Sequence, residues 1–126
     1  MSSRYYITTP IYYVTDAPHI GHLYTTVAAD IMAQYQKMNG KEVWFLTGTD
    51  EHGQKIQKKA KETDETPQAL ADRVVQRYQE AWKLYGIQYN DFIRTTEDRH
   101  KKVVQHFIKK LMDTGDIYLD HYEGLY

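Results

Sequence analysis

Short strand-like runs alternate with longer helix-like runs along this chain, and this alternation constrains the fold more than any other feature. The strand-like runs are rich in aromatic, β-branched or apolar residues: 5–9, 42–47 and 91–94. Three helix-like runs carry apolar residues at three- and four-residue steps, 18–38, 66–84 and 96–112, and a fourth, 52–61, is basic and polar. This order predicts an α/β fold with an open, doubly wound parallel sheet and right-handed crossovers.

Turn and capping residues mark the ends of the predicted elements. Asn39-Gly40 is expected to end the first helix, and Thr66 is expected to cap a helix that opens with Pro67. The segment 10–17 is expected to be irregular, and 116–126 alternates like an antiparallel strand or hairpin arm. One apolar stripe of the first helix is expected to face the core: Ile20, Leu23, Tyr24, Val27, Ile31, Tyr35 and Met38.

Length and composition exclude several classes of protein. A chain of 126 residues suits one compact domain, and its net charge of -1 offers no general basic field for DNA or for an anionic membrane. The absence of cysteine excludes disulfides and thiolate metal sites. No apolar run approaches the roughly 20 residues of a membrane span, and no signal peptide is present. We therefore expect a soluble chain of the cytoplasm.

Two motifs lie where predicted strands end. His19-Ile20-Gly21-His22 opens the first helix, and Gly48-Thr49-Asp50-Glu51-His52-Gly53 leaves the second strand. Ligands of open α/β sheets bind at this edge, next to the free N–H groups of helix N-termini. Two imidazoles three residues apart share one helix face and could donate hydrogen bonds to phosphate oxygens. Gly21 leaves space in which a flat base or sugar could approach the helix backbone.

Four stretches of the sequence resemble the methionyl-tRNA synthetase family of class I, in its bacterial or organellar form. They are YYITTPIYY at 5–13, PHIGH at 18–22, FLTGTDEHGQKI at 45–56 and DFIRTT at 91–96. The resemblance covers essentially the whole chain. It implies the first half of a Rossmann-like, doubly wound parallel sheet, with the His-Ile-Gly-His motif at the start of the first helix.

The resemblance also implies a reaction and its participants. Members of this family join methionine to ATP, giving methionyl-adenylate and pyrophosphate, and then transfer the methionyl group to tRNA(Met). ATP would enter as its Mg²⁺ complex, and no zinc is expected within this chain. No DNA or membrane partner is implied.

Six positions match the substrate-binding positions of the family. The match implies that His19 and His22 contact the ATP phosphates as catalytic residues, and that Gly21 leaves room for the adenosine. Asp50 would pair with the α-ammonium group of methionine. The two remaining positions would line the pocket for the methionine side chain: Ile11 and Tyr13.

The second signature of class I synthetases, Lys-Met-Ser-Lys-Ser, has no counterpart in these 126 residues, whose only serines are Ser2 and Ser3. We therefore expect an N-terminal part of a longer enzyme, catalytically incomplete by itself. Residues 1–115 would form the N-terminal half of the catalytic domain, and residues 116–126 would begin a connective insertion. The tRNA would be bound by regions outside this chain.

Two alternative functions fit parts of the pattern. A small adenylyltransferase also uses a His-x-Gly-His tetrad, although such enzymes carry a complete sheet. A metal-dependent hydrolase could use His19, His22, Asp50 and His52 as ligands. Against it, the histidines are three residues apart with no acid between them, unlike the His-Glu-x-x-His pattern. His52 is also expected to serve only to orient the loop after Asp50.

Overall fold

The computed structural model describes residues 3–121 and 123–124. The chain forms two compact units, Met1–Thr95 and Thr96–Tyr126. The first unit contains the whole sheet and three helices, and the second contains one helix. The two motifs at the strand ends therefore both belong to the first unit.

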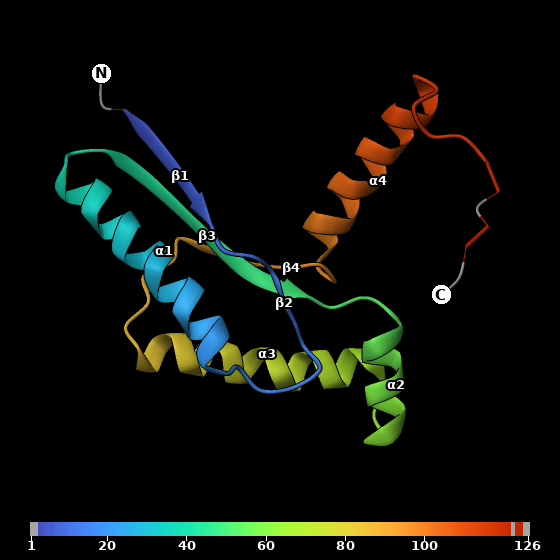
Figure 1. The fold of residues 1–126 in the computed structure, drawn as a ribbon, viewed down its shortest axis with the longest axis horizontal. Helices are drawn as coiled ribbons and strands as arrows, with labels where there is room; N and C mark the ends of the chain where they lie inside the picture. The colour runs from blue at the N-terminus through green and yellow to red at the C-terminus, as the bar shows by residue number, and fades with distance from the viewer. Residues whose placement is uncertain (1–2, 122, 125–126) are drawn as a thin grey trace. The chain divides into compact units, whose positions relative to one another are not determined.

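The first unit is built around a sheet in which every pairing is parallel (Figure 1). Its strands are β1 Arg4–Thr8, β2 Tyr12–Tyr13, β3 Glu42–Asp50 and β4 Asp91–Arg94. β3 is the common partner: β1 pairs with residues 42–46, β4 with 46–49 and β2 with 49–50. The predicted parallel sheet is confirmed, whereas the expectation that 10–17 is irregular throughout is wrong at β2.

The three helices of this unit are α1 Ile20–Met38, α2 Gln54–Glu62 and α3 Pro67–Leu84. Their bounds follow the predicted caps closely. The Thr66 hydroxyl accepts a hydrogen bond from the backbone N–H of Ala69, and Pro67 occupies the first turn of α3. No helix in the described part of the chain has both the length and the apolar character that crossing a membrane requires.

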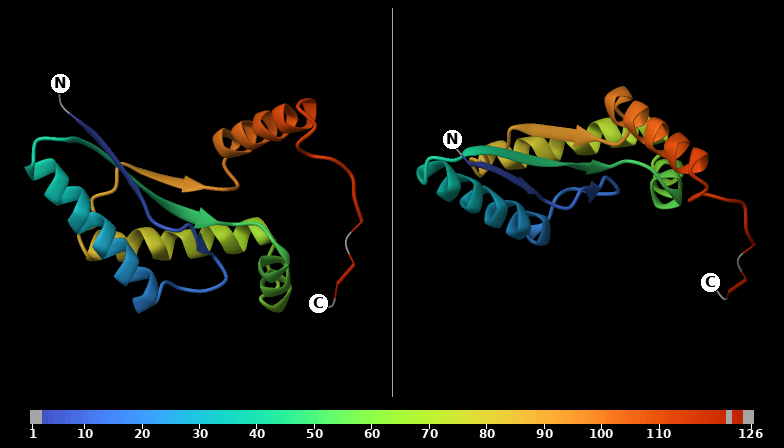
Figure 2. Two further views of the ribbon diagram at one scale, coloured as in Figure 1. Left: turned by 45° about the horizontal axis from the view of Figure 1, so that its top comes forward. Right: turned by 90° about the horizontal axis from the view of Figure 1, so that it is seen from above.

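α1 and α3 cover the same face of the sheet (Figures 1 and 2). Phe45 of β3 is buried against Ala29 and Ala33 of α1. Phe92 of β4 is buried in the core formed with α3 and is paired in register with Thr47, which lies on the same face as Phe45. On the opposite face, Trp44 is 51% exposed. This is the layer pattern expected of the first half of a doubly wound sheet.

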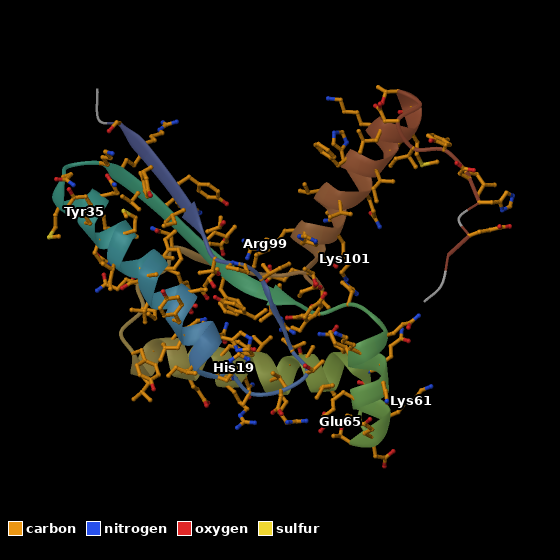
Figure 3. All side chains as sticks on the ribbon, in the orientation of Figure 1. His19, Tyr35, Lys61, Glu65, Arg99 and Lys101 are labelled. Carbon is orange, nitrogen blue, oxygen red and sulfur yellow. The ribbon has the colours of Figure 1, made fainter. Side chains whose placement is uncertain are left out.

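The predicted core face of α1 is wrong for most of its length. The buried residues of this helix are Thr26, Ala29 and Ala33, whose small side chains let the helix approach the sheet closely. Five members of the predicted stripe instead lie outward and exposed: Ile20, Tyr24, Ile31, Tyr35 and Met38 (Tyr35 is labelled in Figure 3). α1 therefore presents its larger apolar side chains away from the core of this unit.

The second unit consists of α4 Asp98–Asp113 and the segment after it. No residue of α4, which is described throughout, is buried. Gly115 has a φ of +78°, a left-handed conformation that favours glycine at a helix end. Residues 114–121 and 123–124 contain no strand, so the predicted antiparallel strand is wrong for the described part of 116–126. A strand needs a partner for its backbone groups, and none is paired with this segment.

We expect the 126-residue chain to self-associate when it is produced alone. Tyr6 and Trp44 are paired in register and both exposed on the open face of the sheet, and the outward side of α1 adds further apolar surface. Analytical sedimentation should show an apparent mass that rises with protein concentration. The double substitution Tyr6→Lys and Trp44→Lys should reduce this rise. Gln57→Lys, at an exposed polar position of α2, is the control and should leave it unchanged. A wild-type chain that stays monomeric at its highest soluble concentration would contradict this expectation.

Candidate active site

His19 and His22 together form the N-terminal cap of α1. The Nδ1 atom of His19 accepts a hydrogen bond from the backbone N–H of Gly21 at 3.1 Å. The Nδ1 atom of His22 accepts one from the backbone N–H of His19, also at 3.1 Å. The two imidazoles therefore act as a capping box, in the roles that Ser or Thr and Glu usually take. Figure 3 shows His19 at the start of α1.

This capping pattern fixes the tautomers of both histidines. A backbone N–H can only donate, so each Nδ1 must be an unprotonated acceptor, and each neutral ring carries its proton on Nε2. The two rings stack, with centroids 3.8 Å apart. Burial, and then the neighbouring His19, lowers the pKa of His22, which keeps this imidazole neutral at pH 7. The tetrad thus provides two Nε2–H donors that the cap does not use.

The cap leaves no room for a side chain at position 21. A Cβ atom at position 21 would lie 2.9 Å from Cε1 of His19 and 3.1 Å from its Nδ1. A side chain there would push the His19 ring off the amide that it caps. The sequence analysis gave Gly21 the role of admitting the adenosine, and the structure adds this second reason for a glycine.

Two buried tyrosines support the tetrad from the side of the core. The Tyr12 hydroxyl lies 2.7 Å from the hydroxyl of Thr25 and 2.9 Å from that of Thr26, in the second turn of α1. The Tyr78 hydroxyl, from α3, lies 3.3 Å from Nδ1 of His22. Burial raises the pKa of Tyr78 to about 12, so its hydroxyl keeps its proton.

A cavity of about 300 Å³ lies beside the tetrad. Four of the predicted site residues line it: Ile11, Tyr13, His19 and His22. The remaining lining comes from the loop before α1, from β2 and from α3: Tyr12, Thr15, Asp16, Ala17 and Tyr78. Gly21 and Asp50 are not among the described residues that line it. The structure thus brings the predicted phosphate-side and methionine-side residues to one cavity, apart from these two.

Asp50 is the last residue of β3 and lies next to the predicted methionine pocket. It is paired in register with Tyr13 of β2, and residues in register on parallel strands project to the same side. Asp50 is half-buried. The residue therefore keeps part of its surface accessible.

A buried ion pair holds the end of β3 to the end of β4. The Glu51 side chain is 0% exposed and accepts two hydrogen bonds from Arg94 in a fork, from Nε to Oε1 at 2.7 Å and from Nη2 to Oε2 at 2.9 Å. The Thr49 hydroxyl donates to Oε1 of Glu51, and Arg94 also contacts Asp72 of α3. The hydrogen bonds to Glu51 raise the pKa of Arg94 further above its ordinary value, so the guanidinium stays charged.

The loop after Asp50 is fastened to the same place. The backbone N–H of Glu51 donates to the Thr95 hydroxyl at 2.8 Å, and Nε2 of His52 lies 3.2 Å from the carbonyl oxygen of Thr95. His52 therefore orients this loop, as expected. The described residues contain no group of three or more His, Asp or Glu side chains that could hold a metal ion. The four residues of the hydrolase alternative do not form a metal site.

The similarity of the chain to known proteins defines the class of protein to which it belongs. The model of the family "tRNA synthetases class I (M)" matches residues 5–126, nearly the whole chain. The chain belongs to this family of class I synthetases, and this excludes the small adenylyltransferase and the hydrolase as its family.

The individual relatives are methionine–tRNA ligases. The chain is 62% identical over 125 residues to methionine–tRNA ligase 1 of Bacillus cereus, and 56% identical over 125 residues to the ligase of Bacillus subtilis. Each match covers 99% of this chain and 19% of the relative, so the chain spans about a fifth of their length.

A solved structure supports the same relationship. Methionyl-tRNA synthetase of Mycobacterium tuberculosis, in complex with methionyl-adenylate, matches 95% of this chain and 24% of its own chain. The TM-score is 0.93 and the sequence identity 38%.

Proposed function

We propose that this chain provides the His-Ile-Gly-His part of a site that activates methionine with ATP, in a methionine–tRNA ligase. The observation that carries this proposal is the likeness to a synthetase solved with methionyl-adenylate, over nearly all of this chain. ATP enters as its Mg²⁺ complex, the protein works in the cytoplasm, and tRNA(Met) is bound by regions outside residues 1–126. Residues 1–115 belong to the catalytic domain, and 116–126 begin a connective insertion.

The reaction requires charge stabilisation more than covalent chemistry. A carboxylate oxygen of methionine forms a bond to the α-phosphorus of ATP while the bond from that phosphorus to the bridging oxygen breaks, and pyrophosphate leaves. Negative charge grows on the phosphate oxygens during this step. The Nε2–H groups of His19 and His22 are free to donate to those oxygens, because both Nδ1 atoms are held by the cap. Gly21 admits the adenosine.

The methionine is held on the other side of the cavity. Ile11 and Tyr13 contact its side chain, and an aromatic ring suits a polarizable thioether. Asp50, beside Tyr13, pairs with its α-ammonium group. Holding the substrate at both ends places the carboxylate against the α-phosphorus, which lowers the entropic part of the barrier.

The test is methionine-dependent exchange of pyrophosphate into ATP, measured on the complete gene product that carries this chain. The proposed function requires exchange that depends on methionine and on no other amino acid. Exchange with another amino acid, or none at all, would contradict the proposal. As a further test, the 125 residues that match can replace the corresponding segment of the Bacillus cereus ligase, which should then remain active.

Replacement of Asp50 with Asn should weaken the binding of methionine about ten- to a hundredfold and leave ATP affinity nearly unchanged. Asn keeps the shape of the side chain but loses the charge, and a charge-assisted hydrogen bond contributes roughly 1.5–3 kcal/mol. Equilibrium titrations with methionine, methioninol and ATP measure this, and methioninol should behave like methionine because it keeps the ammonium group. Asp64→Asn, at an exposed loop position, is the control. If Asp50→Asn abolished ATP binding with methionine unaffected, the assignment of Asp50 would be wrong.

A further inference from the structure

The Tyr78 hydroxyl lies between the two sides of the proposed site. It is 3.3 Å from Nδ1 of His22, at the start of α1, and 3.4 Å from the carbonyl oxygen of Tyr13, in β2. Both of these atoms are acceptors: a carbonyl oxygen cannot donate, and Nδ1 of His22 already accepts from the backbone N–H of His19. The single hydroxyl proton of Tyr78 therefore serves two acceptors on two different elements.

The packing around Tyr78 leaves its hydroxyl little freedom to move elsewhere. Its side chain is completely buried. Its ring stacks on that of Tyr12 at 5.9 Å, meets Trp82 edge-on at 5.8 Å and lies 5.4 Å from the imidazole of His22. Aromatic contacts of this kind fix ring orientation as well as burying surface. The hydroxyl is thus held in place by the core of the unit and not by the tetrad itself.

A hydrogen bond accepted at Nδ1 keeps the proton of a neutral imidazole on Nε2 and restrains the direction of that N–H group. The cap gives His22 one donor at Nδ1, the backbone N–H of His19, which belongs to the same helix turn and moves with it. Tyr78 adds a donor from α3, which fixes the imidazole relative to the core and to β2. The two donors share the one lone pair of Nδ1. The cap already keeps the proton on Nε2, so the hydroxyl of Tyr78 adds a restraint on the direction in which that N–H points.

We infer that Tyr78 is a positioning residue for His22: its hydroxyl fixes the direction of this imidazole, whose tautomer the cap already sets, and couples it to β2 on the methionine side. This inference rests on the proposed function, in which Nε2–H of His22 donates to the phosphates and Tyr13 lines the methionine pocket. Tyr78 also lines the cavity, but in this role its hydroxyl acts through His22 and does not bond to a substrate.

The test is Tyr78→Phe in the complete gene product, because Phe keeps the buried ring and removes only the hydroxyl. The kcat of methionine-dependent pyrophosphate exchange should fall about tenfold, the effect of one hydrogen bond of ordinary strength. The KM values for ATP and methionine should change less than about twofold, since the bond orients a donor that acts in the transition state. Tyr89→Phe is the matched control: its half-buried ring packs on Phe92 and lines a separate cavity, and kcat should not change.

A second measurement, NMR of the His22 ring nitrogens, reports the hydrogen bonding of the imidazole and does not depend on enzyme activity. With ¹⁵N-labelled histidine, the Nδ1 resonance of His22 in Tyr78→Phe should move to the position of a nitrogen that accepts one hydrogen bond fewer, and in Tyr89→Phe it should stay in place. The inference is wrong if this resonance is the same in Tyr78→Phe and wild type. It is also wrong if kcat is unchanged, or if both KM values rise together with a loss of thermal stability. Absence of methionine-dependent exchange in the wild type would overturn the proposed function instead.

Discussion

Replacement of Arg94 with Gln is expected to destabilise the junction between β3 and β4 by about 3–5 kcal/mol, the usual cost of removing one partner from a buried ion pair. The Glu51 carboxylate would stay at a position where its side chain is 0% exposed and would lose both bonds of the guanidinium fork. Hydrogen–deuterium exchange followed by mass spectrometry can measure this locally, in peptides that cover 42–51 and 91–95. Amides that exchange by opening of this junction should exchange about 10² to 4 × 10³ times faster.

The chain contains a well-matched control for this prediction. Arg73 and Glu65 form the same kind of fork, with N–O distances of 3.1 and 3.0 Å, but their side chains are 47% and 27% exposed. Arg73→Gln should therefore cost less than about 1 kcal/mol, as for other exposed ion pairs. Equal effects of the two substitutions would show that burial of Glu51 does not set the strength of its pairing with Arg94.

The order and type of the elements could be predicted because the signals are local. Thr66 and Pro67 mark the start of α3, and the apolar run from Glu42 marks β3. Each of these signals spans only a few neighbouring residues. β2 could not be predicted in this way. It is two residues long, and it exists only because Tyr12 and Tyr13 reach the end of β3 after the chain has passed Pro10.

The buried face of α1 could not be predicted, because two faces of this helix are apolar. Periodicity favoured the face with the larger side chains, which includes Tyr24 and Tyr35. The sheet instead packs against Ala29 and Ala33, because small residues allow closer approach of helix and strand. The sequence pattern indicates how many apolar faces a helix has, but which face meets the sheet depends on the other elements.

In the candidate site, too, some residues could be predicted from the sequence and others could not. His19 and His22 stood out because a tetrad at the start of a helix is a local pattern. The residues that hold the site are far apart in sequence: Tyr78 is 56 residues from His22, and Arg94 is 43 residues from Glu51. Each of them resembles an ordinary core tyrosine or surface arginine until the fold brings the partners together. Contacts of this kind have no signature in a single sequence.

Under the proposed function, replacement of His22 with Ala in the complete gene product is expected to lower the rate of methionyl-adenylate formation by about 10²–10³-fold, the usual effect of removing one preorganised donor from a developing negative charge. ATP affinity should change much less, because the Nε2–H bond strengthens only as charge grows on the phosphate. Single-turnover formation of the adenylate, compared with equilibrium binding of ATP, separates the two effects. His106→Ala, at an exposed position of α4, should leave both unchanged.

The two nitrogens of His22 can be tested separately, because Asn carries its amide near the position of Nδ1 and Gln carries its amide near that of Nε2. His22→Asn keeps an acceptor for the backbone N–H of His19, and so preserves the cap, but it lacks the outward donor. His22→Gln loses much of the cap and keeps an N–H group near the phosphate. If the Nε2–H group acts on the transition state, His22→Asn should be almost as slow as His22→Ala, and His22→Gln should retain a measurable part of the rate despite a less stable helix start. The reverse order, with Asn active and Gln inactive, would mean that His22 serves the cap alone and that the charge on the phosphates is stabilised by other groups.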